Sequence, residues 1–337
     1  MKAVGFQQPG PIERQDALQD ITLEKPVAHG RDLLVEIKAV SVNPVDTKVR
    51  VNRQPQPDSW EILGYDAVGV VNAIGPAVEY FKVGDEVFYA GVINRPGTNS
   101  EFHLVDERIV GRKPTNLSDS EAAALPLTAI TAWEMLFDRL EVLRPTVEGG
   151  KLILVIGGAG GVGSITLQLL RAMTDLTIIA TASRPETKQW VMDSGAHHVL
   201  DHSQPLAPQM EALGLGKPGF VFSTTQTDRH YSDIVELIAP QGRFGLIDDP
   251  PTLDAKPLKM KSISLHWELM FTRPLFSTPD IDKQRTLLNQ VADLVEAGKI
   301  HSTATEVAGK INAANLKKVH AQLESKTTRG KIVLEGF

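Results

Sequence analysis

The strongest constraint on the fold is an apolar run that ends directly in a cluster of glycines. Residues 151–163 read KLILVIGGAGGVG, and the run Leu152–Ile156 shows no polar alternation and is rich in β-branched residues. This pattern predicts a strand that is buried on both faces, as in a parallel sheet. From about Ser164 to Met173 the apolar residues recur with a helical period. The segment therefore predicts a strand, a tight turn and a helix, in that order.

The glycines of this turn match the G-x-G-x-x-G spacing of dinucleotide-binding proteins. Gly158 would permit the turn, Gly160 would let a diphosphate approach the backbone, and Gly163 would let the helix pack on the strand. The helix N-terminus would then face the diphosphate. No Lys-Ser or Lys-Thr pair follows, which disfavours a site for nucleoside triphosphates. Because packing alone can produce the same spacing, the context has to support the assignment.

The central part of the chain alternates between predicted strands and helices. Strands are expected at 176–182, 199–200, 220–222 and 244–247, and helices at 186–194 and 230–238. This alternation predicts an α/β fold with a doubly wound parallel sheet. Ligand sites of such sheets lie beyond the carboxyl ends of the strands. That rule nominates Ser183, His202, Ser223–Thr225 and Ile247–Asp248.

The residues after the second strand bear on the choice of cofactor. An NAD enzyme usually places Asp or Glu about 20 residues beyond the glycines, whereas cations and small donors accept a 2′-phosphate. Here Ser183 and Arg184 follow the strand, with Lys188 one turn on. Arg184 can bind a phosphate through its planar fork, and Ser183 can donate a hydrogen bond. Ser183, Pro185 and Glu186 also satisfy a helix capping box, and both roles can hold together. We expect NADP(H) rather than NAD(H).

The first 110 residues predict a β-rich domain. Strands are expected at 2–6, 33–39, 67–74, 86–90 and 102–105. Asn43 and Asp46 directly follow the second of these, where sites are commonly built, although an Asx turn before proline explains the same residues. Residues 51–59 are polar and proline-rich and predict an exposed loop.

Helix signals follow this β-rich part. Ser118 and Glu121 form a capping box, and Pro126 ends that helix, so a second one should start around Leu127. Thr128 on its first turn is either an ordinary helix residue or a ligand contact. Helices at 280–297 and 312–323 and a strand at 331–334 should complete the chain. The apolar-aromatic stretch 264–271 fits a dimer edge, a core strand or a cleft wall.

Composition excludes several classes of protein. The 337 residues suit two domains, and the absence of cysteine removes disulfides, thiol nucleophiles and thiolate zinc sites. A net charge of −6 gives no basic surface for nucleic acid. No apolar run approaches the length of a membrane span, and the N-terminus lacks the apolar core of a signal peptide. We therefore expect a cytoplasmic protein without nucleic-acid or membrane partners.

Several short motifs occur in an order that is specific. They are Asn43–Asp46, Gly64–Gly69, Val83–Val87, Leu125–Ala129, the glycine turn, Gly195–Ala196 and Gly330–Leu334. In this order they resemble the medium-chain dehydrogenase/reductase superfamily, and within it the zinc-free quinone oxidoreductase branch. The resemblance implies a GroES-like domain of residues 1–122 completed by 272–337. It also implies a Rossmann NADP-binding domain of residues 123–271, NADPH in a cleft, and a homodimer.

The resemblance also implies roles for individual residues. It places Gly160, Gly161 and Val162 on the diphosphate, and Ser183, Arg184 and Lys188 near the 2′-phosphate. His202 would lie against the adenosine, and Asn43 and Thr128 near the nicotinamide. Thr224, Thr225 and Ile247 would lie along the cleft. Zinc-dependent members have cysteine, Gly-His-Glu and a second cysteine where this chain has Asn43, Gly64–Asp66 and Leu127. The four-cysteine structural-zinc loop is absent too. The histidine pairs 197/198 and 198/202 lack a third ligand and do not predict a metal site.

The absence of the zinc-ligand residues bears on the reaction. Without a Lewis acid nothing would stabilise the alkoxide that forms from an unactivated alcohol. A quinone or α,β-unsaturated carbonyl is already electrophilic, so hydride from NADPH needs mainly positioning, a hydrogen-bond donor and a proton from water. We expect NADPH-dependent reduction of such acceptors, with Asn43, Tyr65 or Thr128 as the donor. An NADPH-binding sensor or structural protein and a zinc alcohol dehydrogenase remain as alternatives.

Overall fold

The computed structural model describes all 337 residues and consists of two units. Unit 1 contains Met1–Ile130 and Phe271–Phe337, and unit 2 contains Thr131–Met270. The first boundary lies eight residues beyond the expected 122/123, because helix α3 (Pro126–Trp133) begins within unit 1. There the backbone N–H of Leu127 donates to the Asp66 carboxylate at 2.7 Å. The second boundary differs from the expected one by a single residue.

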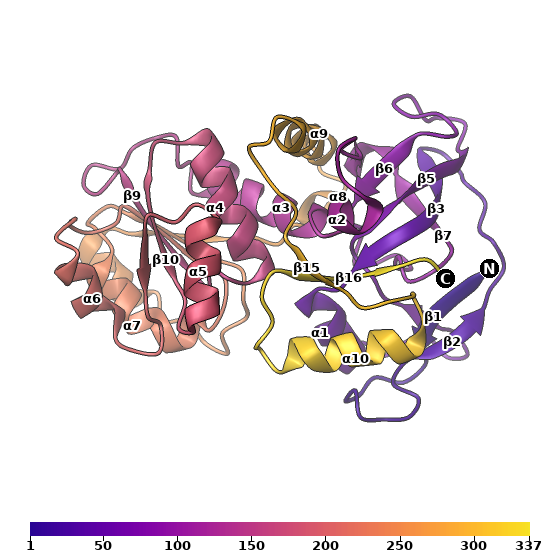
Figure 1. Cartoon of the computed structure of the whole chain (residues 1–337), viewed down its shortest axis with the longest axis horizontal. Coiled ribbons are helices and arrows are strands. Elements are labelled where there is room, and N and C mark those ends of the chain that lie inside the picture. Colours follow the sequence, from indigo (N-terminus) through magenta and orange to yellow (C-terminus); the bar gives the residue numbers. More distant parts are fainter. The chain divides into compact units, whose positions relative to one another are not determined.

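Unit 1 is built on a seven-stranded sheet with the order β15-β16-β3-β5-β6-β8, in which β7 also pairs with β3. Its strands are β3 (Asp32–Ser41), β5 (Ala67–Ile74), β6 (Glu86–Tyr89), β7 (Phe102–Asp106), β8 (Val110–Arg112), β15 (Ala304–Val307) and β16 (Lys331–Glu335). A smaller sheet joins β1 (Lys2–Phe6) to β2 (Gln19–Thr22) and β4 (Glu61–Ile62). Because β16 pairs antiparallel with β3, with Val333 opposite Ser41, the end of the chain completes the unit that its beginning starts (Figure 1).

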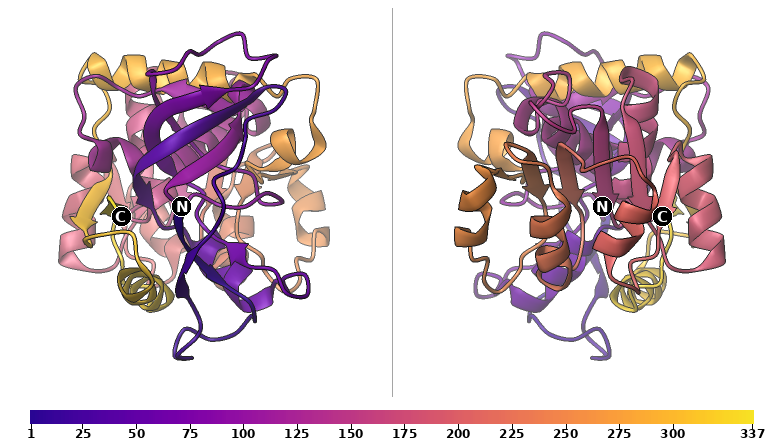
Figure 2. Two further views of the ribbon diagram at one scale, coloured as in Figure 1. Left: turned by 90° about the vertical axis from the view of Figure 1, so that its right-hand side faces the viewer. Right: turned by 90° about the vertical axis from the view of Figure 1, so that its left-hand side faces the viewer.

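Helices lie around this sheet. The left-hand view of Figure 2 shows unit 1 towards the reader. The helices are α1 (Pro44–Asn52), α2 (Asp119–Ala123), α8 (Thr272–Phe276), α9 (Lys283–Glu296) and α10 (Ala313–Glu324), with a 3-10 turn η1 (Glu107–Ile109). The predicted capping box is confirmed, since the Ser118 N–H donates to Glu121 Oε2 at 2.9 Å and the Glu121 N–H donates to Ser118 Oγ at 3.3 Å.

Unit 2 contains the parallel sheet that the sequence predicts, with the order β11-β10-β9-β12-β13-β14. The strands are β9 (Leu152–Ile156), β10 (Thr177–Thr181), β11 (His198–Leu200), β12 (Phe220–Ser223), β13 (Arg243–Leu246) and β14 (Ser264–Trp267). In chain order this is 3-2-1-4-5-6, the arrangement of the Rossmann fold. Every residue of β9 is buried, so the double-sided burial predicted from its apolar run is confirmed.

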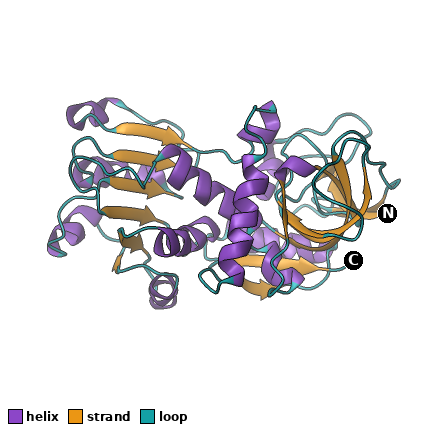
Figure 3. Ribbon diagram, turned by 90° about the horizontal axis from the view of Figure 1, so that it is seen from above, coloured by secondary structure: helices purple, strands orange, loops and turns teal.

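Helices flank both sides of this sheet, as Figure 3 and the right-hand view of Figure 2 show. They are α4 (Gly161–Met173), α5 (Pro185–Asp193), α6 (Leu206–Ala212) and α7 (Thr227–Leu237), with a 3-10 helix η3 (Lys256–Lys261) and a π-helical segment η2 (Glu134–Arg139) that follows α3. None of the helices has the length and apolarity that a membrane span requires.

The structure corrects the predicted start of the helix after Ser183 and specifies the stretch 264–271. The capping box at Ser183 is wrong, because α5 starts one residue later and the Arg184 N–H donates to the Thr187 hydroxyl at 3.2 Å. Proline at the first helical position determined the start. The stretch 264–271 begins as β14, an edge strand. Trp267 at the end of this strand is 50% exposed, and Leu269 just after it is 51% exposed.

Candidate functional site

The glycine turn of unit 2 has the geometry of a phosphate cradle. Gly157 has φ +80°, a conformation that glycine adopts without strain. A Cβ on Gly163 would lie 2.3 Å from the Gly157 carbonyl oxygen, so this position requires glycine for the contact between helix and turn. A Cβ on Gly160 would meet nothing closer than 3.6 Å. The space at Gly160 is therefore open to a ligand.

Helix α4 directs its N-terminus at this space. The helix begins at Gly161, so the N–H groups of Gly161, Val162 and Gly163 have no acceptor within the helix. Such N–H groups and the helix dipole favour a phosphate. Gly158 lies just before them. A Cβ on Gly158 would lie 3.0 Å from the Ala180 side chain of β10 and 3.1 Å from the Val191 side chain of α5, so this position also favours glycine. These residues fit the diphosphate of a dinucleotide.

The predicted phosphate-binding cations each have a carboxylate partner. Arg184 Nε lies 2.6 Å from Glu186 Oε1, and Lys188 Nζ lies 3.0 Å from Asp201 Oδ2. Both cations are about 40% exposed and remain accessible. Hydrogen bonds from Ser203, with Lys188 beside it, lower the pKa of Asp201. A 2′-phosphate would therefore have to compete with Asp201 for Lys188. Asp201 follows β11 rather than β10, so the residues around Ser183 in the sequence do not indicate it.

The remaining candidate cofactor residues lie at the same edge of the sheet. His202 follows β11, Thr224 and Thr225 follow β12, and Ile247 follows β13. The Thr181 hydroxyl and His202 Nδ1 are 3.0 Å apart, and burial lowers the pKa of His202, so its ring is neutral at pH 7. The Thr224 hydroxyl donates to the Ile156 carbonyl at 2.8 Å, which fixes it beside the glycine turn.

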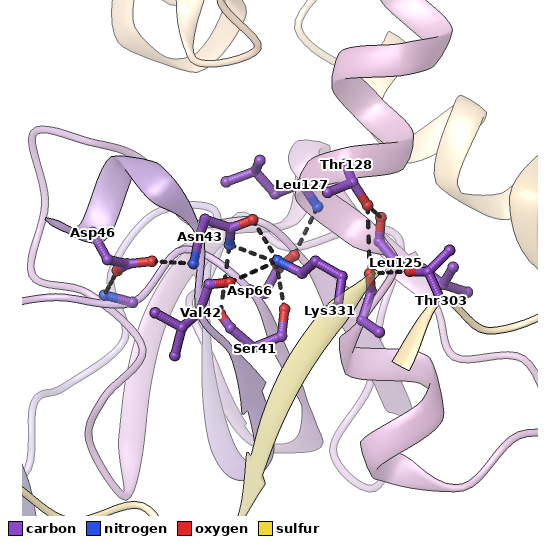
Figure 4. Close-up of polar contacts among 12 residues, drawn as sticks. Ser41, Val42, Asn43, Asp46, Asp66, Leu125, Leu127, Thr128, Thr303 and Lys331 are labelled. Carbon is purple, nitrogen blue, oxygen red and sulfur yellow. Dashed lines mark hydrogen bonds and ion pairs between the residues drawn. The ribbon is translucent and has the colours of Figure 1, made fainter. Parts of the chain in front are cut away.

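Unit 1 holds a second polar cluster, centred on the buried carboxylate of Asp66. Its Oδ1 accepts the Leu127 N–H at 2.7 Å, and its Oδ2 accepts the Ser41 hydroxyl and Asn43 Nδ2, each at 2.7 Å (Figure 4). Asp66 is fully buried and therefore depends on these donors. The carboxylate joins the end of β3, the start of β5 and the start of α3.

Lys331 supplies the only cation that contacts Asp66. Its Nζ lies 3.1 Å from Asp66 Oδ2, donates to the Val42 carbonyl at 3.1 Å, and donates to Asn43 Oδ1 (Figure 4). The lysine side chain is 4% exposed. In the sequence, Lys331 stands out only as part of the motif Gly330–Leu334. Its contact with Asp66, 265 residues away, has no local signal.

The three predicted hydrogen-bond donors differ in what their groups already bind. Asn43 is committed to Asp66 and Lys331, and the Thr128 hydroxyl donates to the Leu125 carbonyl of its own helix at 3.0 Å. The Tyr65 hydroxyl donates to no acceptor, and the polar side chain that acts on it as a donor is Arg53. The buried Tyr65 ring packs edge-on against Phe271 with 5.3 Å between centroids. Burial raises the pKa of Tyr65, so the hydroxyl keeps its proton.

The donor sets in the chain suit a metal poorly. No three His, Cys, Asp or Glu side chains lie close enough together to hold a metal ion. His197 Nδ1 accepts the Ile178 N–H at 2.9 Å, so this histidine is engaged with β10. At the Asn43–Asp66 cluster an ammonium group contacts the very oxygens that a cation would need.

Comparison with known proteins identifies similar domains and relatives. Residues 29–115 match the family of alcohol dehydrogenase GroES-like domains, and residues 194–334 match the zinc-binding dehydrogenase family. A zinc-type alcohol dehydrogenase-like protein of Staphylococcus aureus (strain Mu50) is 40% identical over 99% of both chains. A crystal structure from Rhizobium etli CFN 42, whose name assigns it to the zinc-dependent alcohol dehydrogenases, is 61% identical over 100% of this chain and 98% of that chain, with a TM-score of 0.98. The quinone oxidoreductase of Pseudomonas syringae pv. Tomato DC3000 is 25% identical over 99% of each chain, with a TM-score of 0.83.

Proposed function

Since the chain belongs to the medium-chain dehydrogenase/reductase superfamily, we propose that it reduces quinones or α,β-unsaturated carbonyls with NADPH and without a metal. The observation that carries this proposal is the buried Lys331 ammonium on Asn43 and Asp66. A dication at these oxygens would be repelled by the ammonium group. Neither Tyr65 nor Leu127 replaces the imidazole or thiolate ligands that zinc prefers.

The chemistry follows from what a metal-free site can stabilise. NADPH supplies the hydride when it is bound. In a quinone or enone the negative charge moves to an oxygen remote from the carbon that is attacked, so one hydrogen-bond donor at that oxygen suffices. Tyr65 is the donor that we favour, because its hydroxyl keeps its proton and donates it to no other group. Asn43 and Thr128 are second choices, since their donors are already engaged.

Residues of unit 2 would hold the cofactor. The diphosphate would lie at Gly158, Gly160, Gly161, Val162 and Gly163, where the α4 N–H groups and the open space at Gly160 fit it. Ser183, Arg184 and Lys188 would bind the 2′-phosphate, and His202 would lie against the adenosine. Thr224, Thr225 and Ile247, which follow β12 and β13, would contact the remaining part of the cofactor.

A panel of quinones and enones mixed with NADPH and the purified protein tests the reaction. We expect loss of NADPH absorbance with at least one acceptor, and a lower kcat in Tyr65→Phe. Tight NADPH binding without turnover of any acceptor would refute the reaction and support a sensor or structural protein instead.

The names of the Staphylococcus and Rhizobium relatives favour a zinc alcohol dehydrogenase as the second candidate. Metal analysis of the purified protein distinguishes the two functions. We expect no stoichiometric zinc, and one zinc per chain would overturn the metal-free mechanism.

The preference for NADPH over NADH is a separate proposal. Each charge-assisted contact to a phosphate contributes about 1.5–3 kcal/mol, so Arg184→Ala or Lys188→Ala should weaken NADPH binding roughly tenfold or more. NADH affinity should stay unchanged. Asp201→Asn is the matched control, because it frees Lys188 and should tighten NADPH binding. Equal effects on both cofactors would contradict the assignment.

We also propose a homodimer formed through the β14 edge. The strand has an unpaired edge, and Trp267 at its end and Leu269 just after it are half-exposed. Proteins usually cover a surface of this kind. Light scattering should give twice the chain mass, and Trp267→Lys should shift it towards the monomer.

A further inference from the structure

Thr181 connects two parts of the candidate cofactor site. It is the last residue of β10 and is fully buried. Its hydroxyl oxygen accepts the Gly157 N–H at 3.0 Å, and its carbonyl oxygen accepts the Gly158 N–H at 3.2 Å. The same hydroxyl lies 3.0 Å from Nδ1 of His202, which follows β11. A single residue therefore contacts both the glycine turn and the histidine that we expect against the adenosine.

The direction of these hydrogen bonds follows from what each group can donate. The Gly157 N–H can only donate, so the Thr181 oxygen is the acceptor in that bond. The Thr181 hydroxyl proton then needs an acceptor, because leaving a buried hydroxyl unpaired costs free energy. His202 Nδ1 is the acceptor that lies within reach. Burial lowers the pKa of His202, so the ring is neutral at pH 7. A neutral ring whose Nδ1 accepts a hydrogen bond carries its proton on Nε2.

We propose that Thr181 is a positioning residue that holds His202 as the Nε2–H tautomer and so presents this N–H to the 2′-phosphate of the cofactor. Nε2 makes no hydrogen bond within the protein, and the ring is partly exposed. Asp201, which precedes His202, pairs with Lys188, so the 2′-phosphate proposed for Lys188 would lie nearby. A phosphate oxygen accepts hydrogen bonds and matches an N–H donor. The phosphate contact rests on the proposed function, whereas the tautomer does not.

Four variants separate this role from support of the glycine turn alone. Thr181→Val keeps the shape of the side chain and removes the hydroxyl, and Thr181→Ser keeps the hydroxyl. Thr177→Val makes the same change at the other end of β10, where the hydroxyl makes no hydrogen bond, and is the matched control. His202→Phe removes the ring nitrogens and identifies the His202 signals among those of the 9 histidines.

The first measurement is ¹⁵N NMR of protein labelled at histidine, near pH 7. The proton of His202 should lie on Nε2 in the wild type, in Thr177→Val and in Thr181→Ser. In Thr181→Val the Nδ1 signal should shift, because this nitrogen loses its hydrogen bond. A proton on Nδ1 in the wild type would overturn the tautomer, and the wild-type spectrum decides this even where Thr181→Val does not fold. An unchanged Nδ1 signal in Thr181→Val would overturn the role of Thr181.

The second measurement is calorimetric binding of adenosine 2′,5′-bisphosphate and of 5′-AMP, which lacks the 2′-phosphate. A hydrogen bond to a charged group corresponds to about tenfold in affinity or more, so His202→Phe should weaken the bisphosphate roughly tenfold. Thr181→Val should weaken it about threefold, because the ring keeps an N–H but loses its fixed orientation and tautomer. Affinity for 5′-AMP should change less than about twofold in both variants. Equal losses for both ligands would indicate support of the glycine turn alone and would overturn the contact.

A double-mutant cycle links the two residues. In the His202→Phe background, Thr181→Val should cause no further loss of bisphosphate affinity, because the hydroxyl acts through the ring. Additive losses would overturn this coupling. Absence of NADPH and bisphosphate binding in the wild type would refute the proposed function, while the NMR spectra would still decide the tautomer.

Discussion

Replacement of Lys331 by methionine tests whether the Asp66 cluster depends on its buried cation. Methionine keeps an unbranched apolar side chain as far as Cε and removes the ammonium group. In the structure this deletes contacts to Asp66 Oδ2, the Val42 carbonyl and Asn43 Oδ1, at a position that is 4% exposed. Asp66 would remain as a fully buried negative charge.

The expected cost follows from the donors that stay in place. Removal of one partner from a buried ion pair costs about 3–5 kcal/mol. Asp66 would still accept hydrogen bonds from Ser41, Asn43 and the Leu127 N–H. We therefore expect the lower end, about 3 kcal/mol of unfolding free energy.

A double-mutant cycle in urea isolates the charge. Asp66→Asn together with Lys331→Met leaves no uncompensated ion, so the double variant should be more stable than Lys331→Met alone. The coupling should reach about 2 kcal/mol. A loss below about 1 kcal/mol for Lys331→Met, or strictly additive losses, would refute the view that the ammonium compensates Asp66.

Other predictions follow from single contacts. Gly163→Ala should destabilise the protein by about 2 kcal/mol, because its Cβ would lie 2.3 Å from the Gly157 oxygen. Gly160→Ala, whose Cβ meets nothing closer than 3.6 Å, should preserve the melting temperature and weaken NADPH binding. Melting curves and NADPH titration compare the two variants. Tyr65→Phe should change the unfolding free energy by less than about 0.5 kcal/mol, since its hydroxyl donates to no acceptor, and a larger loss in urea would contradict that reading. Burial lowers the pKa of His320 to about 3, so the folded protein keeps the ring neutral while the unfolded chain protonates below pH 6.5. Stability should therefore fall as the pH drops from 6.5 towards 3, and His320→Leu should reduce this loss in acid unfolding; an unchanged slope would refute it.

Features encoded by neighbouring residues could be predicted from the sequence. The strand Leu152–Ile156, the glycine turn and α4 follow one another without interruption, and each has its own local pattern. The same holds for the Ser118 capping box. At Ser183 two start signals overlapped, a serine followed by glutamate and a proline two residues on, and the fixed φ of Pro185 prevailed.

Contacts between distant residues could not be predicted in this way. Nothing near Asp66 in the sequence indicates its contact with Lys331. The choice at Thr128 was open because a hydroxyl on the first helical turn serves a ligand or its own helix equally well, and the structure has it bonded to the Leu125 carbonyl. Family resemblance supplied the GroES-like domain, which strand patterns alone did not specify.

The discontinuity of unit 1 has a consequence for synthesis on the ribosome. Unit 2 is a continuous stretch from Thr131 to Met270, so it can complete its sheet as soon as that stretch emerges. Unit 1 has to wait for β16, because until then residues 39–41 of β3 lack their partner strand and Asp66 lacks its cation. The domain that starts first along the chain is therefore the last to become native. Until then, the unpaired end of β3 at residues 39–41 is the surface that a nascent-chain chaperone would have to protect.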